Sequence, residues 1–172
     1  MKSLDRVFVA LGSNISPRGK RLADARAMLQ KISLGGWKES AIYETPPVGP
    51  QDQGPFLNQV VSFWYDKGAK RLLHYLKGTE LFLGRRPRGH WREREIDLDL
   101  IYYGETVSRG DPEGPVVPHP RASTRAFVLV PLAEIAPDLR DPLQGKTVKS
   151  LLKDLESAGE YIQFKKMEAG DE

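Results

Sequence analysis

The stretch Glu95–Gly104, "EIDLDLIYYG", decides the fold, because it places two aspartates inside a segment that otherwise reads as an apolar strand. In a β-strand, residues two apart point to the same face of the sheet, with Cα atoms roughly 6.5–7 Å apart. Alternation therefore predicts a core face made of Ile96, Leu98, Leu100 and Tyr102 and a second face made of Asp97, Asp99, Ile101 and Tyr103.

The aspartate pair on the second face needs a physical reason. Asp97 and Asp99 repel each other unless a cation lies between them or water screens them. Mg²⁺ suits such a site, since it takes one or two protein carboxylates and completes its octahedron with water and substrate phosphates. The alternative is a half-exposed sheet whose outer face is acidic and solvated, and periodicity alone favours that alternative.

An arginine-rich run before the strand favours a ligand site over a solvated acidic face. The run comprises Arg85, Arg86, Arg88, Arg92 and Arg94, with Trp91 among them. Guanidinium groups bind phosphate oxygens bidentately and stay charged at any physiological pH. A solvated charged loop is the simpler interpretation of the run by itself. Beside a carboxylate pair, however, it indicates a polyphosphate site with a metal on one side and guanidinium groups on the other.

The remaining sequence predicts a β-α-β-β-α-β order. Apolar patterning and Gly/Pro breaks predict strands at 7–11, 37–44, 56–65, 96–103 and 161–165, and helices at 17–32, 69–83, 121–135 and 148–157. This order is typical of an α+β, ferredoxin-like two-layer sandwich with a mainly antiparallel sheet, helices on one face and C-terminal additions. We expect a single domain over residues 1–166 and a frayed tail over 167–172.

Composition excludes several classes of protein. The 172-residue chain is 40% hydrophobic and 28% charged, with a formal net charge of +3, which is too mild to indicate a dedicated nucleic-acid binder. It has no cysteine, so disulfides, thiolate zinc sites and cysteine nucleophiles are excluded. The N-terminus reads neither as a secretory signal nor as a membrane span, so we expect a cytoplasmic protein without a membrane partner.

Several segments together resemble one enzyme family. They are "LGSN" at 11–14, "YETPPVGPQDQGPFLNQVV" at 43–61, "LGR" at 83–85, "REIDLDLIYYG" at 94–104 and "VPHPRASTRAFVLVPLAEIAPD" at 117–138. Their order resembles that of the 6-hydroxymethyl-7,8-dihydropterin pyrophosphokinases of the folate pathway. The resemblance implies that the pterin hydroxymethyl oxygen attacks the β-phosphorus of ATP and that AMP leaves. It also implies two Mg²⁺ ions that bind with ATP, and we expect the chain to act as a monomer.

The same resemblance implies roles for individual residues. Asp97 and Asp99 match the metal ligands and, with Arg94 and Arg85, the catalytic residues. The pterin-binding positions match Thr45, Pro46, Val48, Phe56, Asn58 and Phe127. The positions around ATP match Glu80, Arg85, Trp91, Arg94, His119 and Arg125.

Local reasoning supports some of these roles and leaves alternatives for others. Phe56 and Asn58 share one face of their strand, and an aromatic ring next to an amide suits a flat heterocycle with polar edges. A hydrogen-bonded core asparagine is the alternative. Glu80 lies one turn after Lys77 and could form only a surface pair. Without the resemblance, Phe127 reads as core, His119 as an ordinary loop residue, and Trp91 as a cover for adenine or a residue packed on its own loop.

The arginine-rich run departs from the family pattern. The family usually reads W-G-P-R where this chain reads "WRER" at 91–94, and the loop before Trp91 is about one residue shorter. The sequence therefore does not decide which of Arg86, Arg88 and Arg92 contacts phosphate. We also expect the loops at 12–16 and 47–54 and the arginine-rich run to close over ATP.

Two other functions fit parts of the pattern. A Mg²⁺-dependent nucleotidyltransferase uses similar carboxylate pairs but releases pyrophosphate. An RNA-binding module could use a ferredoxin-like sheet with a basic loop and exposed aromatic residues. The RNA-binding hypothesis lacks an RNP1-like segment, and the paired aspartates would repel a phosphate backbone.

Overall fold

A computed structural model describes residues 3–110, 114–159 and 164–168 of the chain. Its main sheet has the order β5-β1-β4-β3-β8, with β2 also paired to β4. The strands are β1 (Asp5–Ser13), β2 (Lys38–Glu39), β3 (Tyr43–Thr45), β4 (Phe56–Tyr65), β5 (Asp97–Tyr103) and β8 (Lys165–Lys166). The central strand β1 pairs antiparallel with both β4 and β5. This arrangement confirms the predicted α+β, ferredoxin-like class with a mainly antiparallel sheet.

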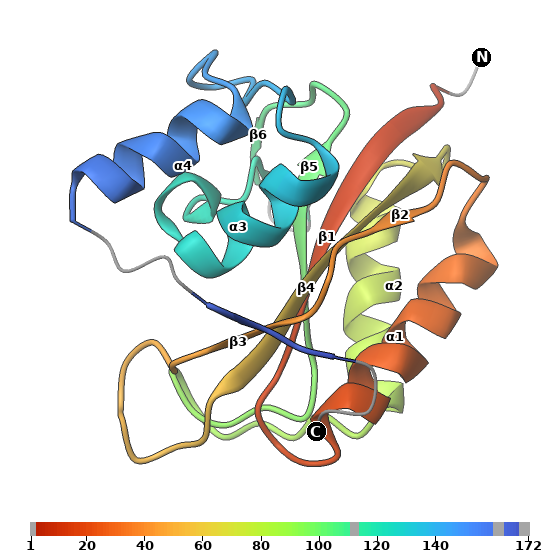
Figure 1. The fold of residues 1–172 in the computed structure, drawn as a ribbon. Helices are drawn as coiled ribbons and strands as arrows, with labels where there is room; N and C mark the ends of the chain where they lie inside the picture. Colours follow the sequence, from red (N-terminus) through yellow and green to blue (C-terminus); the bar gives the residue numbers. More distant parts are fainter. Residues whose placement is uncertain (1–2, 111–113, 160–163, 169–172) are drawn as a thin grey trace.

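The helices lie on two sides of this sheet (Figure 1). Helices α1 (Arg18–Ile32) and α2 (Ala69–Phe82) cover one face and complete the β-α-β-β-α-β unit. The C-terminal additions, α3 (Ala126–Ile135) and α4 (Val148–Ser157), pack on the opposite face. A 3-10 turn, η1 (Ala122–Thr124), precedes α3, and β6 (Ser108–Arg109) pairs with β7 (Val116–Val117) outside the main sheet. The C-terminal additions therefore give part of the domain a third layer.

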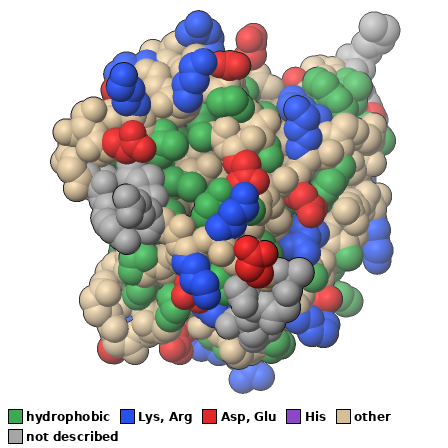
Figure 2. Space-filling view, viewed as in Figure 1, with side chains coloured by type: hydrophobic (Ala, Val, Ile, Leu, Met, Phe, Trp, Pro, Cys, Tyr) green, Lys and Arg blue, Asp and Glu red, His purple; other side chains and the backbone are tan. Residues whose placement is uncertain are grey.

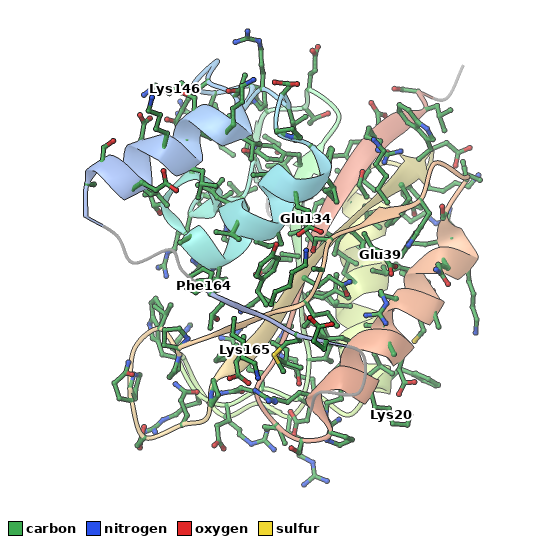
Figure 3. The ribbon with its side chains drawn as sticks, in the orientation of Figure 1. Lys20, Glu39, Glu134, Lys146, Phe164 and Lys165 are labelled. Carbon is green, nitrogen blue, oxygen red and sulfur yellow. The ribbon has the colours of Figure 1, made fainter. Side chains whose placement is uncertain are left out.

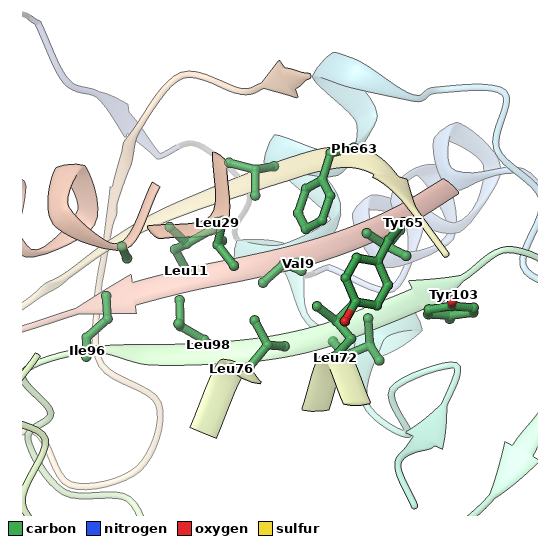
Figure 4. Packing of buried hydrophobic residues seen from close by; sticks show 14 of the residues in the cluster. Val9, Leu11, Leu29, Phe63, Tyr65, Leu72, Leu76, Ile96, Leu98 and Tyr103 are labelled. Atoms are coloured by element: carbon green, nitrogen blue, oxygen red, sulfur yellow. The ribbon is translucent and has the colours of Figure 1, made fainter. Parts of the chain in front are cut away.

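The first core lies between α1, α2 and the sheet (Figure 4). Leu22, Ala25 and Leu29 repeat at intervals of three and four residues, which places them on the buried stripe of α1. Leu72 and Leu76 do the same on α2. These side chains pack against alternate residues of the central strands, including Val7, Val9, Leu11, Leu98 and Leu100. Burial of this face fixes the register of β1, β4 and β5.

The second core covers only part of the opposite face. Phe8 and Val60 pack there against Leu129 and Leu132 of α3 and Leu151 of α4. Phe8 and Tyr102 meet edge to face, with ring centroids 6.3 Å apart. Because α3 and α4 cover the half of this face around these residues, the other half is left free for a site.

The predicted alternation along β5 is wrong beyond Ile101. The pairing of β1 with β5 shifts register between Phe8 and Val9, opposite Tyr102 and Leu100, so an extra residue is inserted into β5 there. Such a β-bulge reverses the facing of every later residue. Tyr102 consequently packs in the second core and Tyr103 in the first, the reverse of the prediction. The prediction for Leu98, Leu100 and Ile101 is confirmed.

Two predicted elements are interrupted. The strand expected at 37–44 is divided into β2 and β3, because the Ser40 hydroxyl accepts a hydrogen bond from the Val60 amide at 3.0 Å and replaces part of the ladder. The helix expected at 121–135 is divided into η1 and α3, because Arg125 adopts an extended backbone with φ −115° and ψ 106°. Of the strand expected at 161–165, residues 161–163 lie outside the described residues, and β8 covers Lys165–Lys166.

Glu134 connects the C-terminal addition to the sheet edge. Its carboxylate accepts hydrogen bonds from the Ala41 amide, at 2.9 Å, and from the Tyr43 hydroxyl. Figure 3 shows Glu134 on α3 beside the strands it joins. Met167 donates to the Ile42 carbonyl at 2.9 Å, so pairing continues just past β8, while residues 169–172 of the predicted tail lie outside the described residues. Among the described residues, no helix is both long and apolar enough to cross a membrane.

The two faces of α2 give a direct test of the packing. We expect Leu76→Ala, at a position with 0% exposure, to lower the free energy of unfolding by about 2–5 kcal/mol. Leu81→Ala on the same helix, at 70% exposure, should change it by no more than about 0.5 kcal/mol. Urea unfolding at 25 °C measures both. Equal effects of the two substitutions would contradict the assignment of the buried face.

Candidate active site

A pocket occupies the uncovered half of the second sheet face. Its empty volume is about 700 Å³ including open solvent at the mouth. Strands β1, β4 and β5 form its floor, and the first turn of α3 and two loops form its walls. It is lined by Ala10, Leu11, Gly12, Thr45, Pro46, Val48, Gln53, Phe56, Asn58, Trp91, Arg92, Arg94, Asp97, Asp99, Arg125, Phe127 and Val128.

One row of residues across the floor organises the pocket. Gly12 of β1 is paired with Asn58 of β4 on one side and with Asp97 of β5 on the other. Since adjacent strands lie about 4.8 Å apart, the Asn58 and Asp97 backbones are separated by about 10 Å. A Cβ atom at position 12 would lie 3.2 Å from Asn58 Oδ1. Glycine therefore keeps the floor open between an amide and a carboxylate.

The Asp97 carboxylate lies between two arginines. One oxygen accepts from Arg85 at 2.8 Å, and the other accepts from Arg94 at 2.9 Å. The side chains of all three residues are 21–27% exposed. The pairs are therefore partly shielded from water, where electrostatic interactions are stronger than on an open surface. Arg94 lines the pocket itself, whereas Arg85 contacts Asp97 from outside the lining.

Asp99 lies deeper along the same strand. It pairs across the sheet with Ala10, which places its side chain on the pocket face. Burial and the nearby charge of Asp97 raise the pKa of Asp99, and the charges of His119, Lys77 and Arg125 oppose that shift. Burial in turn lowers the pKa of His119, against the charge of Asp99. A cation bound at this position would therefore stabilise the ionised form of the Asp99 carboxyl.

Glu80 is buried and holds Arg85 in position, so its contact with Lys77 is not merely a surface pair. It is 3% exposed, and its carboxylate bonds Arg85 at 2.6 Å and accepts from the Leu98 amide at 2.7 Å. Lys77 lies 3.1 Å from the same carboxylate. Burial raises the pKa of Glu80, while the charges of Lys77 and Arg85 and the Leu98 amide oppose that shift. Glu80 therefore positions Arg85 against Asp97 and does not line the pocket.

The opposite side of the pocket is apolar with one polar pair. Asn58 donates from Nδ2 to the Thr45 hydroxyl at 2.6 Å. Phe56 and Phe127 also line the pocket, and the Arg125 guanidinium lies 5.4 Å from the Phe127 ring centroid. Aromatic walls with an amide at one edge suit a flat, polar-edged ring. All six residues predicted to bind the pterin line this one pocket.

The arginine-rich run is organised by carboxylates. Arg88 binds Glu95, and this hydrogen bond holds the pKa of the buried Glu95 carboxyl at about 2, far below its usual range. Arg86 donates only its backbone amide to Glu95, at 3.2 Å. Arg92 lines the pocket and lies 3.3 Å from Asp52. Of the three arginines that the sequence left open, Arg92 is therefore the one placed in the pocket.

Trp91 lies at the rim. Its φ angle is 61°, an uncommon conformation for a residue other than glycine. The Arg121 guanidinium lies 5.1 Å from the Trp91 ring centroid, and a Cβ at Gly49 would come within 3.1 Å of Trp91 Cβ. At 41% exposure the ring remains available for stacking. Trp91 thus packs on its neighbours and still faces the pocket.

Most predicted site residues meet in this pocket. Thr45, Pro46, Val48, Phe56, Asn58, Trp91, Arg94, Asp97, Asp99, Arg125 and Phe127 all line it. Glu80 and Arg85 act through Asp97, and His119 lies near Asp99 without lining the pocket. Reasoning from single residues missed Gly12, Asn14 and Gln53. The quoted segments "LGSN" and "QDQG" contained all three, but their contacts lie between distant parts of the chain.

The donor set fits a divalent cation that is shared with phosphate. Among the described residues there is no group of three or more His, Cys, Asp or Glu side chains that could hold a metal ion by itself. Two carboxylates on one strand face are, however, what Mg²⁺ uses when water and phosphate oxygens supply its other ligands. Asp97 and Asp99 satisfy this requirement, and both line the pocket.

Comparison with known proteins identifies the family. The family model for 7,8-dihydro-6-hydroxymethylpterin-pyrophosphokinase (HPPK) matches residues 8–137. The chain is 40% identical over 158 residues to the 2-amino-4-hydroxy-6-hydroxymethyldihydropteridine pyrophosphokinase of Methylorubrum extorquens, covering 91% of this chain and 97% of that protein. It is 42% identical over 130 residues to the Bacillus subtilis protein of the same name, covering 74% and 76%.

Solved structures agree at the level of the fold. A Plasmodium falciparum HPPK-DHPS triple mutant superposes with a TM-score of 0.70 at 13% identity, covering 94% of this chain and 47% of that one. The chain thus spans about half of the solved chain it matches. The fold agrees with that of the matched chain, and the family match carries the assignment. From the family model and the two bacterial relatives together, the chain belongs to the 7,8-dihydro-6-hydroxymethylpterin-pyrophosphokinase family.

Proposed function

We propose that this chain transfers pyrophosphate from ATP to the hydroxymethyl group of 6-hydroxymethyl-7,8-dihydropterin, releasing AMP, in folate biosynthesis. The family match and the names of its bacterial relatives support an ATP-dependent pyrophosphokinase. In this reaction the hydroxymethyl oxygen forms a bond to the β-phosphorus, and the bond between the β-phosphorus and the bridging oxygen to the α-phosphate breaks. The hydroxyl proton is released, and AMP carries away the bridging oxygen.

The observation that carries the proposal is the row Asn58–Gly12–Asp97 across the floor. It places a polar-edged aromatic slot and a carboxylate site about two strand spacings apart on one sheet face. A pterin bound against Asn58, Phe56 and Phe127 would direct its substituent over Gly12. A triphosphate bound at Asp97 would reach the same point from the other side. Alignment of this kind, together with electrostatic stabilisation, is what a protein mainly contributes to phosphoryl-type transfer.

Arginines on the nucleotide side would neutralise the charge that develops during the transfer. Arg94 and Arg125 line the pocket, and Arg85 is held against Asp97 by Glu80. Guanidinium groups fixed before the reaction stabilise a transition state without reorganisation cost. His119 lies close enough to Asp99 for mutual electrostatic effects. This position makes it a candidate hydrogen-bond donor to a phosphate oxygen. Trp91 at the rim offers a stacking surface for the adenine.

Asp97 and Asp99 would hold the metal. Mg²⁺ bound between these carboxylates and the phosphates would supply Lewis-acid neutralisation of the phosphate oxygens. Arg85 and Arg94 neutralise Asp97 when the site holds no cation, since each binds one of its oxygens. We infer that two ions enter with ATP, as the resemblance to the family implies. Two protein carboxylates would leave most coordination positions to the nucleotide and water.

The two rival functions receive less support. The named bacterial relatives are pyrophosphokinases rather than nucleotidyltransferases. Basic and acidic side chains are interspersed over the face seen in Figure 2, instead of forming the single basic surface typical of RNA-binding sheets. A monomeric state, a cytoplasmic location and the absence of nucleic-acid binding stay predictions from the sequence.

Identification of the nucleotide product tests the function. We expect AMP to form in step with pterin consumption when the protein is incubated with ATP, Mg²⁺ and 6-hydroxymethyl-7,8-dihydropterin. Chromatography of the nucleotides measures the product, and omission of the pterin is the control. ADP, free pyrophosphate or no turnover would reject the proposal.

The two aspartates should respond differently to neutral substitution. We expect Asp97→Asn and Asp99→Asn each to lower turnover by about 10²–10³-fold, the usual effect of removing one electrostatic stabiliser of a transition state. Asp99→Asn should not lower the melting temperature, because it removes a half-buried charge that faces Asp97. Asp97→Asn should lower it, because Arg85 and Arg94 lose their shared partner.

Steady-state rates and thermal melts of the two aspartate variants measure both effects. Near-normal turnover in either variant would count against metal binding there. Equal melting temperatures would count against the arginine pairing of Asp97.

Glu80 offers a test of positioning. Glu80→Gln keeps an acceptor for the Leu98 amide but removes the charge that holds Arg85. We expect turnover to fall by about 10-fold, as for other residues that orient a metal ligand. Glu93→Gln, an exposed substitution in the arginine-rich run, is the matched control. Equal turnover in the two variants would show that Arg85 does not depend on the Glu80 carboxylate for its position.

A further inference from the structure

A tight turn beside β5 holds His119. Its backbone amide donates to the Ile101 carbonyl at 2.9 Å, and its carbonyl accepts from the Ala122 amide at 3.0 Å. The second of these bonds closes a β-turn whose central residues are Pro120 and Arg121. Proline supplies the fixed φ that the first central position favours, and Arg121 has φ −113° and ψ 7°, near the values of the second. The backbone of His119 is therefore fixed on both sides.

The turn also engages one nitrogen of the imidazole. The Arg121 backbone amide donates to His119 Nδ1 at 3.2 Å. A side chain that accepts from the amide two residues later is the arrangement that Asn and Asp form in Asx-turns. Because a backbone amide keeps its proton, the Nδ1 atom that accepts from it carries none. In a neutral imidazole one nitrogen donates and the other accepts, so the ring proton is on Nε2.

The surroundings of the ring favour its neutral form. An imidazolium would carry a proton on Nδ1 as well, and the hydrogen bond from the Arg121 amide would be lost. Burial lowers the pKa of His119, and the charges of Arg125 and Arg121 act in the same direction. The charges of Asp99 and Asp97 oppose that shift. At neutral pH the ring therefore adds a hydrogen-bond donor to the site but no charge.

We propose that the Arg121 backbone amide holds His119 as the neutral Nε2–H tautomer, so that His119 takes part in the transfer as an uncharged hydrogen-bond donor and not as an acid or a base. This inference rests on the proposed function and deepens it by assigning the tautomer and the charge of one residue. Among the described residues no hydrogen bond engages Nε2, and the ring lies near Asp99 of the pocket. The Nε2–H group is therefore left for a phosphate oxygen bound near Asp99.

This tautomer excludes proton transfer by His119 during the reaction. A base needs a free lone pair to take the hydroxyl proton, but Nδ1 already accepts from Arg121 and Nε2 carries the proton. An acid would need the imidazolium form, which the turn opposes. A fixed N–H dipole still stabilises negative charge on a phosphate oxygen without reorganisation cost. Since Arg94 and Arg125 already line the pocket, a neutral donor adds no repulsion among the cations.

Two amide substitutions separate the roles of the two ring nitrogens. Glutamine can place its NH2 group near the position of Nε2, whereas asparagine can place its oxygen near that of Nδ1. His119→Gln therefore keeps a neutral donor, and His119→Asn keeps only the acceptor for Arg121. We expect turnover to fall by no more than about 10-fold in His119→Gln and by about 10²–10³-fold in His119→Asn. His74→Gln, an exposed substitution on α2, is the matched control and should leave turnover unchanged.

Rates of AMP formation at saturating ATP and pterin measure turnover, and thermal melts show that each variant is folded. Because His119 exchanges no proton in the reaction, the pH dependence of kcat should be the same in the unaltered enzyme and in His119→Gln. Equal losses in the two folded variants would overturn the proposal. So would an inflection of the pH profile near neutral pH that disappears in His119→Gln, since it indicates proton transfer by the ring.

The nitrogen chemical shifts of the imidazole test the tautomer without turnover. The chain has three histidines, so spectra of His74→Gln and His119→Gln identify the signals of His119 in the isotope-labelled, ligand-free protein. We expect a protonated Nε2 and an unprotonated Nδ1 at neutral pH. A proton on Nδ1, or on both nitrogens, would overturn the proposal whatever the turnover. Failure of the unaltered enzyme to form AMP would instead reject the proposed function, and the tautomer would still be read from the spectra.

Discussion

The antiparallel pairing of β1 with both β4 and β5 is the constraint on which the rest of the structure depends. Because side chains alternate along each strand, a row across three paired strands presents all its side chains to one face. Burial under α1 and α2 fixes which face that is, and so brings Asp97, Gly12 and Asn58 to the opposite one. The chemistry then falls on the half of that face which α3 and α4 leave uncovered.

The charged groups at the site are arranged for position more than for stability. Glu80 is almost fully buried, and Asp97, Arg85 and Arg94 are partly shielded from water. Removing charges from water costs much of what their attraction returns, so such pairs are weak contributors to folding. What they provide is a set of guanidinium groups held in place before any ligand arrives. That property suits a reaction whose main requirement is alignment and neutralisation of charge.

Periodicity was sufficient to predict the sheet, the two covering helices and the facing of Asp97 and Asp99. It failed at Tyr102 and Tyr103, because a β-bulge depends on the pairing of two strands and leaves no mark in one of them. It also left open whether Glu80 forms only a surface pair with Lys77, since burial against β5 is a tertiary property. Asn14 and Gln53 escaped notice for the same reason: Asn14 meets residues 39 and 80 positions away in the chain.

In the proposed reaction, a pterin and a triphosphate lie side by side on the open sheet face with Gly12 between them. A crystal structure with an unreactive ATP analogue, Mg²⁺ and 6-hydroxymethyl-7,8-dihydropterin measures this directly. We expect the pterin ring against Phe56, Asn58 and Phe127, the β-phosphate beside Asp97 and Asp99, and the hydroxymethyl oxygen over Gly12, within about 3–3.5 Å of the β-phosphorus. A nucleotide or pterin bound away from this face, or reacting atoms on opposite sides of the sheet, would contradict the account.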